Sequence, residues 1–182
     1  MKTLFGLSCV SLWILLLVGQ GADGANPSEY QLKAVFLFNF AQFVEWPRDV
    51  FPEPRSPVVI GILGEDPFGS SLDETVRGED VDSRPLVVQR YRSPDEIRAC
   101  HILFVSRSEA AHLDQIVMSL RGRKILTVCD AEGSARRGVM IRFVTEKNKI
   151  RLRINLEATK ASDLTISSKL LRGAEIVASG KD

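Results

Sequence analysis

The fold follows from one short stretch of sequence, Val58-Val-Ile-Gly-Ile-Leu63. An uninterrupted apolar run of this kind is typical of a strand that is buried on both faces of a parallel sheet. Strands and helices alternate after it: strands are predicted at 86–90, 100–106 and 124–129, and helical segments at about 70–77, 93–98 and 109–120. Such alternation implies right-handed βαβ crossovers. The sequence therefore predicts an α/β fold, a three-layer α/β/α sandwich around a mainly parallel sheet.

The hydrophobic pattern changes after Gly138. Val139, Ile141 and Phe143 alternate with Met140 and Arg142, and after the polar turn Glu146-Lys-Asn-Lys149 apolar residues alternate with Arg151 and Arg153 over 150–154. This pattern predicts a C-terminal antiparallel β-hairpin with one basic, solvated face, which extends the sheet or forms its edge. The rest of the chain is predicted to be helical at 155–161 and 167–178.

A long helix is predicted before the first strand, over residues 28–45. Ser28 and Gln31 form a capping box at its start, and Trp46-Pro47 ends it. Apolar residues cover nearly its whole circumference, so the helix must be buried on more than one side. Phe36, Phe40 and Phe43 follow helical spacing. They belong either to the core or to a surface that meets another protein.

Residues 1–25 have the layout of a secretory signal peptide. Lys2 precedes an apolar run over 4–18, and a stretch of small and polar residues follows. The run is shorter than the roughly 20 residues that a membrane-spanning helix needs. We expect cleavage between Ala22 and Asn26, although an uncleaved anchor would also export the chain. One exported domain, residues 26–182, is then predicted.

Composition excludes several classes of protein. Of 182 residues, 45% are hydrophobic and 26% are charged, which is typical of a folded domain. Twenty-four basic and 23 acidic residues give a net charge of +1. A neutral chain whose basic hairpin has no interleaved aromatic residues is not expected to bind nucleic acid.

No catalytic, metal or cofactor site is predicted. The two histidines, His101 and His112, have no metal-binding spacing, and no nucleophile or phosphate-binding motif is present. Cys100 and Cys129 should lie at opposite ends of neighbouring parallel strands, beyond the limit of about 7 Å between bridged Cα atoms. Both are therefore predicted to be free thiols, with no disulfide.

A ligand pocket is an alternative function. In open α/β sheets, ligands bind at the carboxyl ends of the strands. The residues that the sequence places there are Gly64, Glu65, Asp66, Phe68 and Ser106. A small-ligand-binding sensor module is therefore the second hypothesis.

Four stretches carry a resemblance to a known family. Asn39-Phe-Ala-Gln-Phe-Val-Glu-Trp-Pro47 resembles the Asn-Phe-x-x-Phe-x-x-Trp-Pro signature of the YfiR family. The later stretches 61–69, 100–106 and 154–171 are similar to that family's second, third and closing blocks. Together the four blocks extend in order from residue 30 to about 177.

The resemblance implies a periplasmic, non-catalytic repressor, exported by a cleaved signal peptide. Its partner would be the periplasmic sensing domain of an inner-membrane diguanylate cyclase or a related sensor protein, and repression would lower cyclic di-GMP and biofilm formation. It also implies a homodimer, and in some members release by an outer-membrane lipoprotein. Some relatives contain disulfides, whereas Cys100 has no obvious partner here. The residues expected to bind the partner are Phe36, Phe40, Phe43 and Trp46 on the aromatic helix and Arg142, Arg151 and Arg153 on the basic hairpin.

Overall fold

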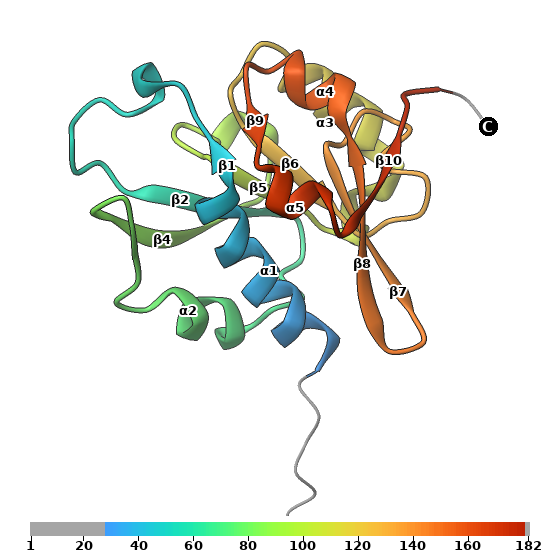
Figure 1. Cartoon of the computed structure of the whole chain (residues 1–182), viewed down its shortest axis with the longest axis horizontal. Coiled ribbons are helices and arrows are strands. Elements are labelled where there is room, and N and C mark those ends of the chain that lie inside the picture. The colour runs from blue at the N-terminus through green and yellow to red at the C-terminus, as the bar shows by residue number, and fades with distance from the viewer. Residues whose placement is uncertain (1–27, 181–182) are drawn as a thin grey trace, which may run out of the picture.

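The computed structural model describes residues 28–180, so the predicted signal peptide lies outside the described part. Within this range one large sheet has helices on both faces (Figure 1). Its strands, from edge to edge, are β10 (Ala174–Val177), β8 (Lys149–Asn155), β7 (Ile141–Glu146), β6 (Leu126–Cys129), β5 (Ile102–Val105), β2 (Val58–Leu63), β4 (Arg84–Tyr91) and β3 (Asp80–Val81). The helices are α1 (Glu29–Phe43), α2 (Ser70–Val76), α3 (Leu113–Ser119), α4 (Leu156–Lys160) and α5 (Ser168–Leu171), with 3-10 turns η1 (Arg48–Val50), η2 (Pro94–Glu96) and η3 (Arg107–His112).

The centre of the sheet is parallel, from β4 through β2, β5 and β6 to β7. β7 and β8 form an antiparallel hairpin. The predicted sandwich with a mainly parallel sheet and a C-terminal hairpin is therefore confirmed. β4 follows β2 in the chain and lies on one side of it, whereas the next strand, β5, lies on the other side. The winding thus reverses between β2 and β5, which is the kind of position where α/β folds bind ligands.

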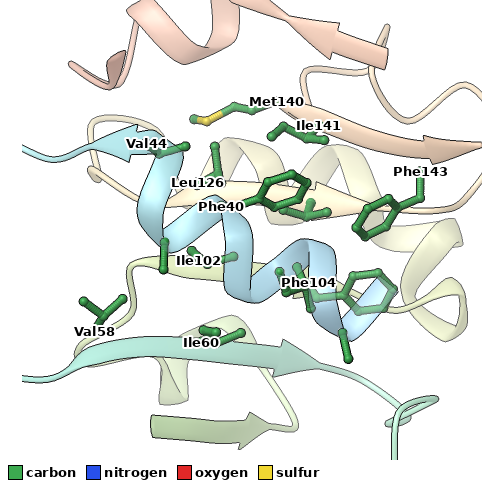
Figure 2. Close-up of a cluster of buried hydrophobic side chains, with 14 of the residues drawn as sticks. Phe40, Val44, Val58, Ile60, Ile102, Phe104, Leu126, Met140, Ile141 and Phe143 are labelled. Atoms are coloured by element: carbon green, nitrogen blue, oxygen red, sulfur yellow. The ribbon is translucent and has the colours of Figure 1, made fainter. Parts of the chain in front are cut away.

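Each face of the sheet has its own hydrophobic core. Helices α1 and α2 cover one face, where Ile60, Phe104 and Phe143 belong to the same buried cluster as Phe40 (Figure 2). Helix α3 covers the other face, where Leu103 is buried among apolar side chains. Because β2 contacts both cores, all six of its residues are buried. This double burial is the physical reason for its uninterrupted apolar sequence.

Helix α1 begins at the predicted capping box. The Ser28 side chain accepts a hydrogen bond from the Gln31 amide, and the Gln31 side chain accepts one from the Ser28 amide. The helix ends at Val44, where the chain becomes extended and forms β1 (Val44–Glu45). β1 pairs antiparallel with β9 (Thr165–Ile166), in a two-stranded sheet separate from the main one. The end of α1 is therefore attached to the last third of the domain.

Two predicted helical segments are wrong in detail. Residues 174–177 form strand β10, which pairs in parallel with β8, and not the end of a helix. The backbone groups of β8 on that side would otherwise be unpaired, and this tertiary pairing outweighs local helical preference. Residues 107–112 form a 3-10 turn before α3, so the α-helix there is shorter than predicted.

No helix in residues 28–180 is long and apolar enough to cross a bilayer.

Candidate functional site

The aromatic residues of α1 lie mainly in the core. Phe40 is completely buried and stacks on Phe143, with ring centroids 5.8 Å apart. Its assignment to a partner-binding surface is therefore wrong, because a side chain with no exposed area cannot contact another protein. Phe36, Phe43 and Trp46 are half-buried. These three form the rim of the α1 core and reach the surface only in part.

Exposed apolar side chains identify three surfaces of residues 28–180. The large apolar side chains with the highest exposure are Val35 on α1 at 46%, Met118 on α3 at 62% and Ile176 on β10 at 49%. They lie on different elements: α1 and α3 are on opposite faces of the sheet, and β10 is at its edge. Val35 directly precedes the half-buried Phe36 on α1, so it adds an exposed apolar side chain next to the rim of the α1 core.

The three arginines of the hairpin have different environments. Arg151 is exposed, whereas Arg142 and Arg153 are half-buried. Arg142 and Arg153 lie directly opposite each other in the β7–β8 register. The Arg153 Nε donates a hydrogen bond of 2.7 Å to the Glu175 Oε2 on β10. Only Arg151 of this predicted set projects from the surface.

The predicted ligand-pocket residues surround the reversal point between β2 and β5. Gly64 has a positive φ of 90°, and a Cβ there would collide with the side chains of Ser108 and Glu109. The Glu65 amide donates a hydrogen bond of 3.0 Å to the Ser108 Oγ. Ser106 is buried, and its side chain accepts a hydrogen bond from the Ser108 amide. Side chains of the chain itself therefore occupy the space above Gly64.

The other two pocket residues have structural contacts. Asp66 accepts a hydrogen bond from the Phe68 amide at 2.7 Å through one oxygen, and its second oxygen pairs with the Arg90 Nε at 2.7 Å. Phe68 is buried edge-on against Tyr30 and Phe104, at centroid distances of 5.5 and 4.8 Å. The loop after β2 thus packs against the first turn of α1.

A buried charge cluster beside this loop was not predicted from the sequence. We call it the Asp130 cluster; its members are Glu29, Tyr30, Lys33, Arg107 and Asp130. The Asp130 Oδ2 accepts hydrogen bonds from the Lys33 Nζ at 2.5 Å and from the Tyr30 hydroxyl at 2.9 Å. Its Oδ1 lies 3.1 Å from the Arg107 Nε, and Lys33 also pairs with Glu29 at 2.5 Å. The Lys33 side chain has no exposed area and that of Asp130 has 1%.

The electrostatics of the Asp130 cluster favour a structural role. Two cations and two carboxylates compensate one another, which is the condition under which buried charges are tolerated. Burial, followed by the Asp130 charge, raises the pKa of Tyr30 to about 12, so Tyr30 stays protonated as a donor. The hydrogen bond from Lys33 lowers the pKa of Glu29. The cluster holds the start of α1 to the ends of β5 and β6.

Two signals in the sequence could have revealed this cluster. Lys33 stands within an otherwise apolar part of α1, on a helix that must be buried on several sides. Asp130 directly follows β6, at the carboxyl edge of the sheet. A buried lysine requires a carboxylate partner, and the end of a neighbouring strand is where one is found.

A second cluster lies at the opposite end of α1. His101, just before β5, is 5% exposed, and its Nδ1 accepts a hydrogen bond of 3.0 Å from the Val59 amide. Its ring stacks on Phe51 at 4.6 Å and meets Trp46 edge-on at 6.1 Å. Burial, with a smaller contribution from the Arg84 charge, lowers the pKa of His101 to about 4. His101 is thus a neutral packing residue at physiological pH.

Cys100 and Cys129 are both free and buried. Burial raises the pKa of the Cys100 thiol to about 12, and burial also raises that of Cys129. Neither thiol is therefore in the reactive thiolate form near neutral pH.

Within residues 28–180 no group of three or more His, Cys, Asp or Glu side chains is placed to hold a metal ion.

The residues that the structure describes thus form an α/β sandwich with two filled cores, a charge-compensated cluster around Asp130 and partly exposed aromatic residues on α1. The family model described as YfiR/HmsC-like matches residues 30–175, and the chain belongs to this family. The family is regulatory and not catalytic, and it points to cyclic di-GMP signalling. A comparison with curated proteins found no match.

The four stretches that carry the sequence resemblance meet around α1. The Phe43 carbonyl, in the first block, accepts a hydrogen bond of 2.8 Å from the Ser167 amide in the closing block. Trp46 of the first block contacts His101 of the third, and Phe68 of the second block contacts Tyr30 at the start of α1. The signature thus describes the attachment of α1 to the rest of the domain.

Proposed function

We propose that this protein is a periplasmic, non-catalytic regulator that binds the periplasmic sensing domain of an inner-membrane diguanylate cyclase or a related signalling protein. Binding represses the cyclase and lowers cyclic di-GMP. The observation that carries the proposal is the family match over residues 30–175, which extends from α1 into β10 and so includes all of the large sheet except the last two residues of β10. The predicted signal peptide supports the compartment, and the proposal includes a homodimer and release by an outer-membrane lipoprotein.

The rim of α1 is the docking surface that fits this role best. Val35 is exposed on the outer side of α1, and Phe36 and Phe43 are half-buried. Arg151 on the hairpin is exposed but points to the opposite face of the sheet, because its neighbours Ile150 and Leu152 pack in the α1 core, so it lies outside this surface. Apolar side chains near the centre of an interface supply most of its binding energy, and charges at the rim set orientation.

Repression requires that the regulator bind one conformation of its partner more tightly than the other. A change from 1:99 to 99:1 in a two-state partner needs about 5.5 kcal/mol of differential affinity. About three anchors that become buried in the interface supply energy of this size, because truncating a hot-spot residue costs about 2 kcal/mol or more. The proposed mechanism therefore needs no reaction at the regulator.

Deletion of the protein from its own bacterium tests the proposal. Cellular cyclic di-GMP should rise on deletion and return to the original level when the full chain is restored. Restoring the Val35→Glu variant should leave cyclic di-GMP high, because it places a charge in the proposed interface without altering the core. Met118→Glu is the matched control, since it makes the same kind of change at an exposed site on α3 and should restore repression.

Two further measurements complete the test. Periplasmic amounts of both variants should equal that of the wild type, which shows that each folds and is exported. Unchanged cyclic di-GMP on deletion would contradict the regulatory role. Full repression by Val35→Glu with loss in Met118→Glu would instead move the docking surface to α3.

A further inference from the structure

A small cavity lies where the basic face of the hairpin meets the loop after β6. Its volume is about 160 Å³. Arg142 from β7 and Arg153 from β8 line it, together with Glu175 from β10 and Arg136 and Glu132 from the loop. Neither the family signature nor the surface of α1 includes this cavity. It lies on the face of the hairpin that is turned away from the α1 core.

The strand register explains why two arginines meet there. Ile141, Phe143, Leu152 and Ile154 are buried in the α1 core, so the residues between them point to the opposite face. Arg142 and Arg153 are direct partners in the antiparallel β7–β8 pair. Like charges directly opposite each other in a sheet are destabilising unless an anion separates them.

Of these two arginines, only Arg153 has a hydrogen-bond partner for its Nε among the described residues. Arg153 donates through its Nε to Glu175 at 2.7 Å. The Arg142 Nε is buried and has no hydrogen-bond partner in residues 28–180. A guanidinium has five N–H donors and no acceptor, and a buried donor without a partner carries the full cost of its desolvation. An acceptor from outside the chain would remove that cost.

We propose that this cavity binds a small oxyanion, a phosphate or carboxylate group, through Arg142 and Arg153. Planar guanidinium groups bind such oxygens in pairs of charge-assisted hydrogen bonds. The cavity has the volume of roughly five water molecules, which is sufficient for one such group. Glu175 competes for Arg153, so the bound anion shares that side chain with β10. The proposal does not depend on the function proposed above.

Isothermal titration of the purified protein with inorganic phosphate and with acetate tests this site, with chloride used to keep the ionic strength constant. We expect saturable one-site binding of one or both anions. The Arg142→Gln variant should bind at least about tenfold more weakly, because a charge-assisted hydrogen bond is lost. Preference for phosphate would indicate a phosphate-bearing natural ligand, and preference for acetate would indicate a carboxylate.

Two variants separate a specific site from general attraction to positive charge. Arg151→Gln removes the same charge from an exposed position on the same strand, two residues from Arg153 and outside the cavity, and should leave binding unchanged. Glu175→Gln removes the competing carboxylate and should strengthen binding. Partial unfolding would weaken anion binding, so it cannot account for an increase in affinity.

The proposal is overturned by either of two results. One is the absence of saturable heat with both anions in the folded wild type and in Glu175→Gln. The other is an equal loss of affinity in Arg142→Gln and Arg151→Gln, which would show a nonspecific charge effect. Circular dichroism of each variant without anion checks that the fold is intact, and a misfolded Arg142→Gln leaves Glu175→Gln as the deciding variant.

Discussion

The Lys33 Nζ lies 2.5 Å from the Asp130 Oδ2, and both side chains are buried. This ion pair joins the second turn of α1 to the residue that follows β6. The Tyr30 hydroxyl donates to the same carboxylate and the Arg107 Nε lies 3.1 Å from its Oδ1, so one aspartate gathers a hydroxyl and two cations from two parts of the chain. The position of α1 on the sheet depends on this carboxylate as well as on apolar packing.

Asp130→Asn should therefore be strongly destabilising. Removing one partner leaves the Lys33 charge buried with only Glu29 beside it, and we expect a loss of about 3–5 kcal/mol in the free energy of unfolding. The double variant Lys33→Met/Asp130→Asn should lose less than the sum of the two single changes. Urea denaturation measures all three. Lys124→Met, which breaks a pair with the exposed Asp49, is the control and should change stability little.

The stability of the protein should fall in mild acid because of His101. Its folded pKa of about 4 lies below the ordinary histidine pKa of 6.5, so the unfolded chain binds a proton first as the pH falls. The contribution of His101 is complete above about pH 6.5 and decreases as the pH falls toward about 4, by up to about 3 kcal/mol. Urea denaturation at several pH values measures this loss.

The His101→Gln variant isolates this effect from other acid-sensitive groups. A glutamine side chain keeps an acceptor for the Val59 amide and does not titrate. Its stability should change less than that of the wild type between about pH 6.5 and pH 4.5. Parallel pH profiles for the two proteins would rule out His101 as the source of the loss.

Gly61 should tolerate no side chain. An added Cβ would lie 2.6 Å from the Tyr91 Cε2 and 2.8 Å from the Cys100 Sγ. Since both neighbours are in a filled core, Gly61→Ala should lower the free energy of unfolding by about 1–3 kcal/mol. Gly173→Ala is the control, because nothing lies within 4 Å of an added Cβ there. A Gly61→Ala variant with wild-type thermal stability would contradict the close packing.

Both buried thiols should resist alkylation in the folded protein. With a pKa of about 12, Cys100 has almost no thiolate at pH 8, and burial also blocks access to it. Iodoacetamide should modify Cys100 and Cys129 in denaturant and leave them unmodified under native conditions. Peptide mass spectrometry measures each site. Rapid native modification of Cys100 at the rate of the unfolded chain would show that the start of β5 opens readily.

Local sequence patterns predicted the strands that are buried uniformly on both faces or on one face of the sheet. The apolar run 58–63 and the alternation over 139–154 indicated the parallel centre and the hairpin, because burial on two faces or one face imposes these patterns directly. Residues 174–177 were assigned to a helix, since Ala-Glu-Ile-Val has no strong pattern of its own. Its strand structure comes from pairing with β8, which local sequence does not encode.

The candidate site was less predictable for a related reason. Phe36, Phe40 and Phe43 have the same residue type and the same helical spacing, yet only Phe40 is completely buried. Which of these side chains is buried depends on how α1 is oriented on the sheet. Likewise, Lys33 and Asp130 are far apart in sequence, and their partnership follows from the arrangement of α1 over β6.

The pairing of β1 with β9 has a consequence for how the domain assembles. Val44 is opposite Ile166, so the sequence signature at the end of α1 acquires its backbone partner only after most of the chain has been synthesised. Contacts between such distant positions require closure of a long loop, which slows folding. An early fragment that ends before β9 would leave the backbone groups of Val44 and Glu45 without their strand partner. This domain should fold as one late, cooperative unit.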